Sequence, residues 1–294
     1  LRTKAQALHL MGRLEESLAF YDQASDLYAR QGKEVESSRS LIGKIDALLH
    51  LGLYHRALNT AQTCCTVFAA HGEPLLEAKV LMNRANIYYR LDRYDEALGT
   101  YRKARRIFDS HGEKFLTALA DTNLGNSYTN IAQFRQAEQA FHRAGKVYQQ
   151  LDTKAALGMN ESNLGYLCFL KGNYNEALVK LGSARRLFEE MGVFRNVATV
   201  DLDTAEVYSA LNMGPKALAA YDSALTVFRS LGFTSEVAKG LLGKGAVHAQ
   251  ARDNELAESE LAEAKRYFED EGNQAYIGLA ELHQLLDAGL PGVL

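Results

Sequence analysis

Asparagine recurs in this sequence at intervals of forty residues, at Asn83, Asn123 and Asn163, and Asp203 continues the series. A carboxamide offers two N–H donors and one oxygen acceptor, the groups needed to bind the backbone of an extended peptide whatever its sequence. Asparagine is a mediocre helix former, so helix stability does not explain its recurrence within segments whose pattern is helical. The spacing therefore indicates a column of peptide-binding side chains.

A second polar series begins three residues after the first, and residues three apart lie on one face of a helix. The two series and their extension by one turn define the candidate binding residues, which are Asn83, Asn86, Arg90, Asn123, Asn126, Asn130, Asn163, Asp203 and Glu206. Two interpretations stay open. Either these side chains hold a bound peptide, or they bond neighbouring helices and solvent as part of the repeat itself.

The residue types that commonly perform catalysis form no recognised motif. None of the eight histidines has the H-E-x-x-H spacing of a zinc protease, and no P-loop, nucleophile elbow or dinucleotide fingerprint occurs. The three cysteines, Cys64, Cys65 and Cys168, fit neither a disulfide framework nor a zinc site. Cys64 occupies a position that is alanine in other repeats, so we expect buried thiols in a reducing, cytoplasmic compartment. The sequence thus predicts no enzyme, no cofactor and no metal ion.

The elements that must position the asparagines repeat with the same period. Alanine recurs at Ala57, Ala97, Ala137, Ala177, Ala217 and Ala257, and an aromatic residue at Tyr28, Phe68, Phe108, Tyr148, Phe188, Phe228 and Phe268. A fixed pattern of small and large apolar residues is typical of a solenoid, in which each repeat buries its apolar face against its neighbours. We expect an all-α protein of about seven helical pairs.

One repeat is clearest over residues 116–151, where two amphipathic segments flank a short turn near Ala132. Gly125 and Gly165 recur in the first segment, at positions where we expect two helices to approach closely. Proline is favourable in the first turn of a helix and unfavourable in its interior. The second helix of the sixth repeat should therefore begin at Pro215.

The period divides the chain into seven repeats and a capping helix within one superhelical domain, 1–294. The expected repeats are 1–32, 33–72, 73–112, 113–152, 153–192, 193–232 and 233–272, and the capping helix is 274–288. The chain starts inside a helical pattern and without an initiator methionine. We therefore expect a piece of a longer protein, with a further domain or partner after Leu294.

The pattern resembles that of the tetratricopeptide repeat. The matching residues are Leu124, Gly125 and Tyr128 on the first helix and Phe134, Ala137, Phe141 and Ala144 after the turn. The longer period is similar to that of kinesin light chains and of many bacterial regulatory arrays, including those that precede CHAT-type protease domains. The resemblance implies a right-handed α-solenoid whose first helices line a concave groove. Long-period relatives bind peptides there through asparagine ladders.

The charge distribution limits the class of partner. Residues 1–150 carry a formal charge of +4 and residues 151–294 one of −7, and the later first helices contribute acidic groove residues such as Asp201. Such a balance argues against nucleic acid and favours a protein or peptide. No apolar stretch reaches the roughly 18 residues of a membrane span. We expect a non-catalytic scaffold that binds a protein or peptide in the groove. The alternative is a ligand-sensing or autoinhibitory region of a larger CHAT-type protease or transcription regulator.

Overall fold

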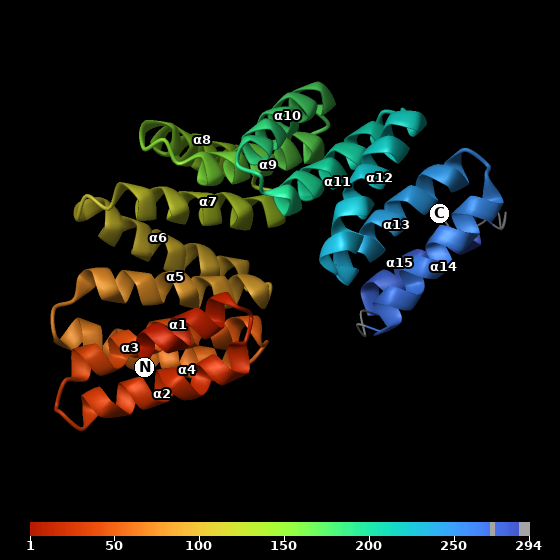
Figure 1. The fold of residues 1–294 in the computed structure, drawn as a ribbon. Coiled ribbons are helices and arrows are strands. Elements are labelled where there is room, and N and C mark those ends of the chain that lie inside the picture. Colours follow the sequence, from red (N-terminus) through yellow and green to blue (C-terminus); the bar gives the residue numbers. More distant parts are fainter. Residues whose placement is uncertain (271–273, 288–294) are drawn as a thin grey trace. The chain divides into compact units, whose positions relative to one another are not determined.

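The computed structural model describes residues 1–270 and 274–287, which form fifteen α-helices and no strand. The helices are α1 (Arg2–Leu10), α2 (Leu14–Ala29), α3 (Glu34–His50), α4 (Tyr54–Ala70), α5 (Pro74–Arg90), α6 (Tyr94–Ser110), α7 (Lys114–Asn130), α8 (Phe134–Gln150), α9 (Lys154–Leu170), α10 (Tyr174–Glu190), α11 (Phe194–Ala210), α12 (Gly214–Leu231), α13 (Thr234–Gln250), α14 (Asn254–Asp270) and α15 (Gln274–Asp287) (Figure 1). The predicted all-α class is confirmed. Residue 288, the predicted end of the capping helix, lies outside the described residues.

Short loops join the helices, and a residue with positive φ recurs in them every twenty residues from Gly12 to Arg252. At Gly52, where φ is +71°, the chain leaves α3 and the following N–H, of Leu53, donates back to the carbonyl oxygen of Leu48 over 2.9 Å. This closing bond satisfies a carbonyl group that the helix end would leave unpaired. Ala132 adopts the same conformation without being glycine, at φ +56°.

The apolar series forms the core, as the period predicts. All six alanines of the Ala57 series are fully buried, and so are the aromatic residues from Phe68 to Phe268, whereas Tyr28 is partly exposed. A Cβ atom added at Gly125 would lie 2.4 Å from Phe141, and one added at Gly165 would lie 2.7 Å from Leu181. Both glycines therefore stand where two helices approach closely, as expected.

Two further expectations are confirmed by the helices of individual repeats. Helix α12 begins at Gly214 with Pro215 in its first turn, which is where a missing N–H costs nothing. The three cysteines are free and buried. Burial raises the pKa of the Cys64 thiol to about 12, so this thiol stays protonated and unreactive at neutral pH.

The chain separates into two compact units, Leu1–Leu151 and Asp152–Leu294, each made of whole repeats. We call them unit 1, which contains α1–α8, and unit 2, which contains α9–α15. In unit 1 the first helices α1, α3 and α5 contact one another in turn, and in unit 2 α9, α11, α13 and α15 do the same. Each unit thus has its own layer of first helices, and these carry the predicted binding residues. The single domain 1–294 remains a prediction.

Candidate functional site

A hollow of about 210 Å³ in unit 1 brings four of the predicted binding residues together. Its lining residues, which define the unit 1 hollow, are Asp46, Leu49, His50, Asn86, Tyr89, Arg90, Tyr101, Asn123 and Asn126. They come from three successive first helices, α3, α5 and α7, and from α6. The forty-residue spacing therefore places carboxamides from neighbouring repeats around one opening.

A hydrogen-bond network fixes two of these carboxamides. The Tyr101 hydroxyl donates to Oδ1 of Asn86 over 2.6 Å, and Nδ2 of Asn123 donates to the same oxygen over 3.4 Å. Burial raises the pKa of Tyr101, which keeps its hydroxyl protonated and able to donate. Since the Asn86 oxygen already accepts two hydrogen bonds, its NH₂ group is the part that remains for other partners. Within the described residues Asn126 makes no side-chain hydrogen bond, so its donors and acceptor are both available.

Two predicted residues of unit 1 bond neighbouring helices instead. Nδ2 of Asn83 donates to the backbone oxygen of Ile42 over 3.3 Å, and Asn83 does not line the hollow. Nδ2 of Asn130 donates to the hydroxyl of Tyr89 over 2.8 Å, at the edge of the hollow. For Asn83 the geometry favours a role in joining repeats. Of the two interpretations left open by the sequence, the bonds of Asn83 and Asn130 agree with the second, in which the side chains join neighbouring helices.

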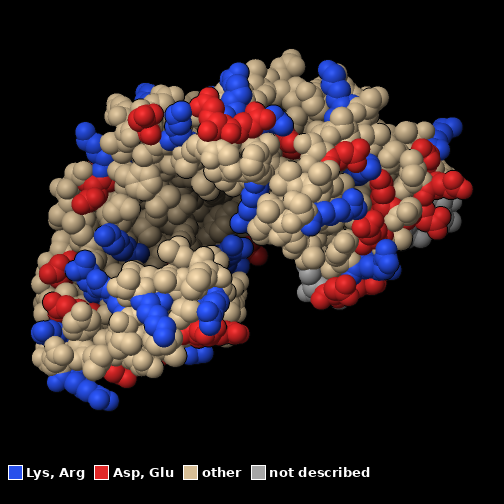
Figure 2. Space-filling model, in the orientation of Figure 1, with Lys and Arg blue, Asp and Glu red and all other residues tan. Residues whose placement is uncertain are grey.

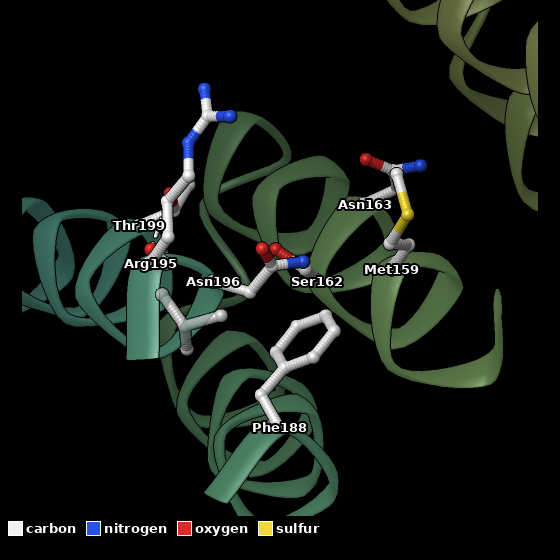
Figure 3. Close-up of a pocket in the computed structure, with 8 residues that line it drawn as sticks. Met159, Ser162, Asn163, Phe188, Arg195, Asn196 and Thr199 are labelled. Carbon is white, nitrogen blue, oxygen red and sulfur yellow. Dashed lines mark hydrogen bonds between the residues drawn. The ribbon is translucent and has the colours of Figure 1, made fainter. Parts of the chain in front are cut away.

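A second hollow, of about 330 Å³, lies in unit 2 and includes Asn163. Its lining residues, which define the unit 2 hollow, are Met159, Ser162, Asn163, Phe188, Arg195, Asn196, Thr199 and Val200. Figure 3 shows Arg195 and Thr199 of α11 on one side of the opening and Met159 and Asn163 of α9 on the other. Asn163 makes no side-chain hydrogen bond within the described part of the chain, so its carboxamide is free to bind a ligand.

Sequence reasoning missed Asn196, which lies in the unit 2 hollow. The forty-residue spacing carried a signal, because the same position is Leu76, Leu116 and Ala156 in the three preceding repeats. A carboxamide that replaces an apolar residue in a repeat is a departure that packing does not require. Asn163, which lines the same hollow, stands 33 residues earlier. The forty-residue spacing therefore did not pair the two asparagines.

The two acidic members of the predicted site form a separate pair on α11. Oγ of Ser162 donates to Oδ2 of Asp203 over 3.4 Å. Burial, and then the charge of Glu206, raises the pKa of Asp203 to about 7. Burial also raises the pKa of Glu206, against the opposing effect of Lys239. Neither carboxyl group lines the unit 2 hollow, so this pair is a titratable feature beside it.

Asp201, expected among the acidic groove residues, has a packing role instead. It is buried, and its Oδ1 accepts from Nε of Arg185 over 2.7 Å while Oδ2 accepts from Ser223 over 2.7 Å. Eighty residues earlier, Asp121 is buried between Arg105 and Arg143 in the same way. A buried carboxylate needs such partners, so Asp201 is not available to a ligand.

The surface outside the hollows carries mixed charge. On the face shown in Figure 2, basic and acidic side chains are interspersed over the helices of both units. The formal charge of +4 for unit 1 and −7 for unit 2 follows the division into compact units. Among the helices that the structure describes, none combines the length and the apolar character that crossing a bilayer requires.

Solved structures with the same fold are numerous. RapI in its apo form is 15% identical with a TM-score of 0.72, and the match covers 97% of this chain and 94% of that one. A Rap protein complexed with competence and sporulation factor is 15% identical with a TM-score of 0.65, over 86% of this chain and 75% of that one. BtubC (BKLC) from P. vanneervenii is 21% identical with a TM-score of 0.64, over 74% of this chain and 92% of that one. At these identities the likeness shows the fold.

Family models place the sequence more directly. Among curated proteins no sequence matches this chain. The model described as tetratricopeptide repeat matches residues 76–150, which confirms the resemblance found in the sequence. The model described as soluble NSF attachment protein, SNAP, matches residues 122–275, just over half of the chain. The chain therefore belongs to the soluble NSF attachment protein family, SNAP, and its helical pairs are tetratricopeptide repeats.

Proposed function

We propose that this chain is a non-catalytic scaffold that binds protein or peptide segments in the hollows formed by its first helices. The observation that carries the proposal is the meeting of Asn86, Asn123 and Asn126 around the unit 1 hollow. An extended peptide presents a backbone N–H and C=O at every residue, spaced by about 3.3 Å along the strand. Carboxamides match both groups and select no side chain, so they suit the backbone of a partner.

The charged side chains add a preference for sequence. Arg90 lines the unit 1 hollow, in a unit of formal charge +4, and suits an acidic segment. Unit 2 has a formal charge of −7, with Asp203 and Glu206 outside its hollow and Arg195 in the hollow wall, so its net charge favours a basic segment that keeps a carboxylate for Arg195. Complementary charge acts chiefly on specificity and on the rate of association. Three buried free cysteines accord with a reducing compartment such as the cytoplasm.

The alternative proposal is that the same hollows sense a ligand on behalf of a larger regulatory protein. Its support comes from the Rap protein whose structure holds competence and sporulation factor, because that array shares the fold. By analogy, the hollows of this chain are candidates for holding such a factor. In this case binding would change the activity of an attached domain, whereas a scaffold functions without an attached domain.

Selection of random peptides from a phage-displayed library tests the proposal. Peptides that bind the unaltered chain should lose affinity by at least about tenfold in Asn123→Ala with Asn126→Ala, or in Asn163→Ala with Asn196→Ala. The matched control is Asn59→Ala, because Asn59 is an exposed asparagine on the second helix α4. Each variant should keep its thermal midpoint within about 2 °C, since none of these side chains is a core residue.

Three outcomes contradict the proposal. The library could yield no binder, or its binders could keep their affinity in both double variants. The double variants could also unfold at much lower temperature than Asn59→Ala, in which case the asparagines act in joining helices. If a peptide loses affinity in only one double variant, its binding site lies in the unit that carries that variant.

A further inference from the structure

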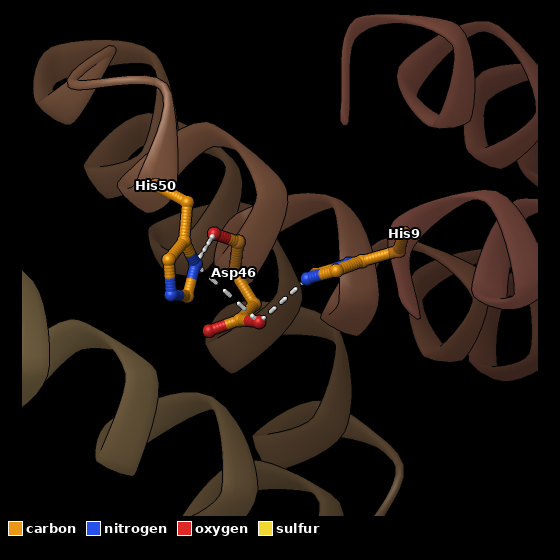
Figure 4. A group of neighbouring side chains, drawn as sticks. All are labelled: His9, Asp46 and His50. Atoms are coloured by element: carbon orange, nitrogen blue, oxygen red, sulfur yellow. Dashed lines mark hydrogen bonds and ion pairs between the residues drawn. The ribbon is translucent and has the colours of Figure 1, made fainter. Parts of the chain in front are cut away.

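Two histidines and an aspartate meet at one end of the unit 1 hollow. Nε2 of His9, on α1, lies 3.0 Å from Oδ2 of Asp46, on α3. Nδ1 of His50, one turn along α3, lies 3.7 Å from the same oxygen. One potential ligand atom from each residue lies within 4.8 Å of the other two (Figure 4). We call these three residues the His-Asp-His cluster.

Two members of the cluster occupy the register positions of the candidate binding residues in the following repeats. Asp46 corresponds to Asn86 and Asn126 at intervals of forty, and His50 corresponds to Arg90 and Asn130. Both Asp46 and His50 line the unit 1 hollow, so the cluster is part of its wall. His9 comes from α1 and completes the group from the first repeat. Where later repeats place asparagine or arginine, this one places a carboxylate and an imidazole, which are common metal ligands.

We propose that His9, Asp46 and His50 bind a divalent transition-metal ion such as Zn²⁺ in the wall of the unit 1 hollow. Two imidazoles and a carboxylate are a ligand set of zinc, nickel, cobalt and copper, whereas magnesium and calcium prefer oxygen alone. Ligand atoms about 2.0–2.2 Å from a metal lie roughly 3.3 Å apart in a tetrahedral site. The cluster needs only modest side-chain rotation to reach that spacing, and its side chains are 18%, 35% and 50% exposed for His9, Asp46 and His50.

A backbone contact already orients one ligand. Nδ1 of His50 lies 2.9 Å from the carbonyl oxygen of Asp46. While Nδ1 donates to the carbonyl, Nε2 carries the lone pair, so the metal binds Nε2 with this bond kept or Nδ1 with this bond broken. Three protein ligands leave at least one coordination position. Because the hollow adjoins the cluster, that position would take water or a group of a molecule bound in the hollow.

Isothermal titration calorimetry of the metal-free full chain with Zn²⁺ tests the proposal. We expect one ion per chain, and at least about tenfold weaker binding in His9→Ala, His50→Ala and Asp46→Asn. The matched control is His142→Ala, because His142 also has a carboxylate one turn away, Glu138 at 3.9 Å, and belongs to no such cluster. Circular dichroism shows whether each variant remains folded, and Asp46→Asn keeps the shape of the side chain.

Co²⁺ provides a second readout that a simple ion pair would not give. The chain with Co²⁺ should show visible absorption bands of a nitrogen- and oxygen-ligated ion, and the three variants should lose them. Binding should also weaken as the pH falls from 7.5 to 5.5, because imidazole and carboxylate ligands must be unprotonated to bind a metal ion. Absence of stoichiometric binding, or unchanged binding in both histidine variants, overturns the proposal and leaves only the ion pair between His9 and Asp46.

Discussion

The two units carry different chemistry at equivalent positions of their first helices. In unit 1, positions 86 and 126 are asparagine, and Tyr101 and Asn123 bond the Asn86 carboxamide into a network. In unit 2, Glu206 stands at the position of Asn86 and Asp203 at that of Asn83, while Asn163 keeps the asparagine. The first arrangement is neutral and held in place. The second titrates, because burial and mutual repulsion raise the pKa of Asp203 to about 7.

The difference separates what the solenoid needs from what a ligand needs. The alanine, aromatic and glycine positions keep their character in both units because each repeat must pack against the next. The polar positions of the first helices are free of that requirement and vary from amide to carboxylate. Recognition can therefore change from one unit to the other while the core stays the same.

The largest effect should come from filling the close approach in one unit. Gly125→Val places atoms against Phe141, which is buried and has no room to move, and should destabilise unit 1 by about 3 kcal/mol. Hydrogen exchange measured by mass spectrometry should show faster exchange in α7 and α8 and little change in α11–α14. Gly165→Val should instead speed exchange in α9 and α10 of unit 2 and change unit 1 little, because Leu181 leaves no space there.

Gly99→Val and Gly182→Val are the matched controls, since a Cβ at either position meets no atom within 4 Å. Both should change stability far less than the packing variants. The experiment also tests the single domain predicted from the sequence. Faster exchange spread evenly over both units after Gly125→Val would show that the two units unfold together.

The acidic pair of unit 2 should make its stability depend on pH. The folded chain raises the pKa of Asp203 from an ordinary value of about 4 to about 7, so the folded state keeps a proton that the unfolded state releases. The stabilising contribution is full below about pH 4 and is lost as the pH rises through 7. Asp203→Asn removes this dependence.

Asp203→Asn should stabilise unit 2 by about 2 kcal/mol at pH 8, allowing for solvent screening of a partly exposed group, and change little at pH 4. Urea unfolding at the two pH values measures the difference. The corresponding change in unit 1, Asn123→Asp, should instead introduce a new pH dependence there. An equal gain at both pH values for Asp203→Asn would show that the carboxyl group keeps an ordinary pKa.

A smaller gain is expected at Asn160. This residue is fully buried, and neither polar atom of its carboxamide has a hydrogen-bond partner in the described structure. The same register position is Val80, Ala120 and Val200 in other repeats. A buried amide without a partner costs about 1–3 kcal/mol, so Asn160→Ala should stabilise the chain by about 1 kcal/mol in urea unfolding. A loss of stability would show that the carboxamide bonds a group such as an ordered water.

The sequence predicted the core and the turns well because those positions repeat for steric reasons. Ala57, Gly125 and Pro215 each have the role expected from their spacing. The polar contacts were harder to predict. A fixed spacing relates residues at the same position in successive repeats, and it does not pair residues that stand at different positions. His9 and His50 stand 41 residues apart, so the forty-residue period never paired them.

A periodic pattern also could not predict which partner each polar side chain bonds. Asn83 and Asn123 share one register position, yet the first bonds the backbone of Ile42 and the second bonds the side chain of Asn86. Which of these forms depends on the residues of the neighbouring repeat. A column of identical residues therefore indicates a candidate surface, and the contacts decide which members of it are available.

The smallest expected effect concerns the turns at equivalent places in the two units. Ala132, in unit 1, adopts φ +56°, and Gly172, in unit 2, adopts +76°. A left-handed conformation costs alanine about 1 kcal/mol relative to glycine, and the greater freedom of glycine in the unfolded chain offsets part of the gain. Ala132→Gly should therefore stabilise unit 1, and Gly172→Ala should destabilise unit 2, each by about 0.5 kcal/mol. Both changes are measurable as shifts in urea midpoint. A loss of stability in Ala132→Gly would show that the Ala132 methyl group contributes more through contacts than its backbone conformation costs.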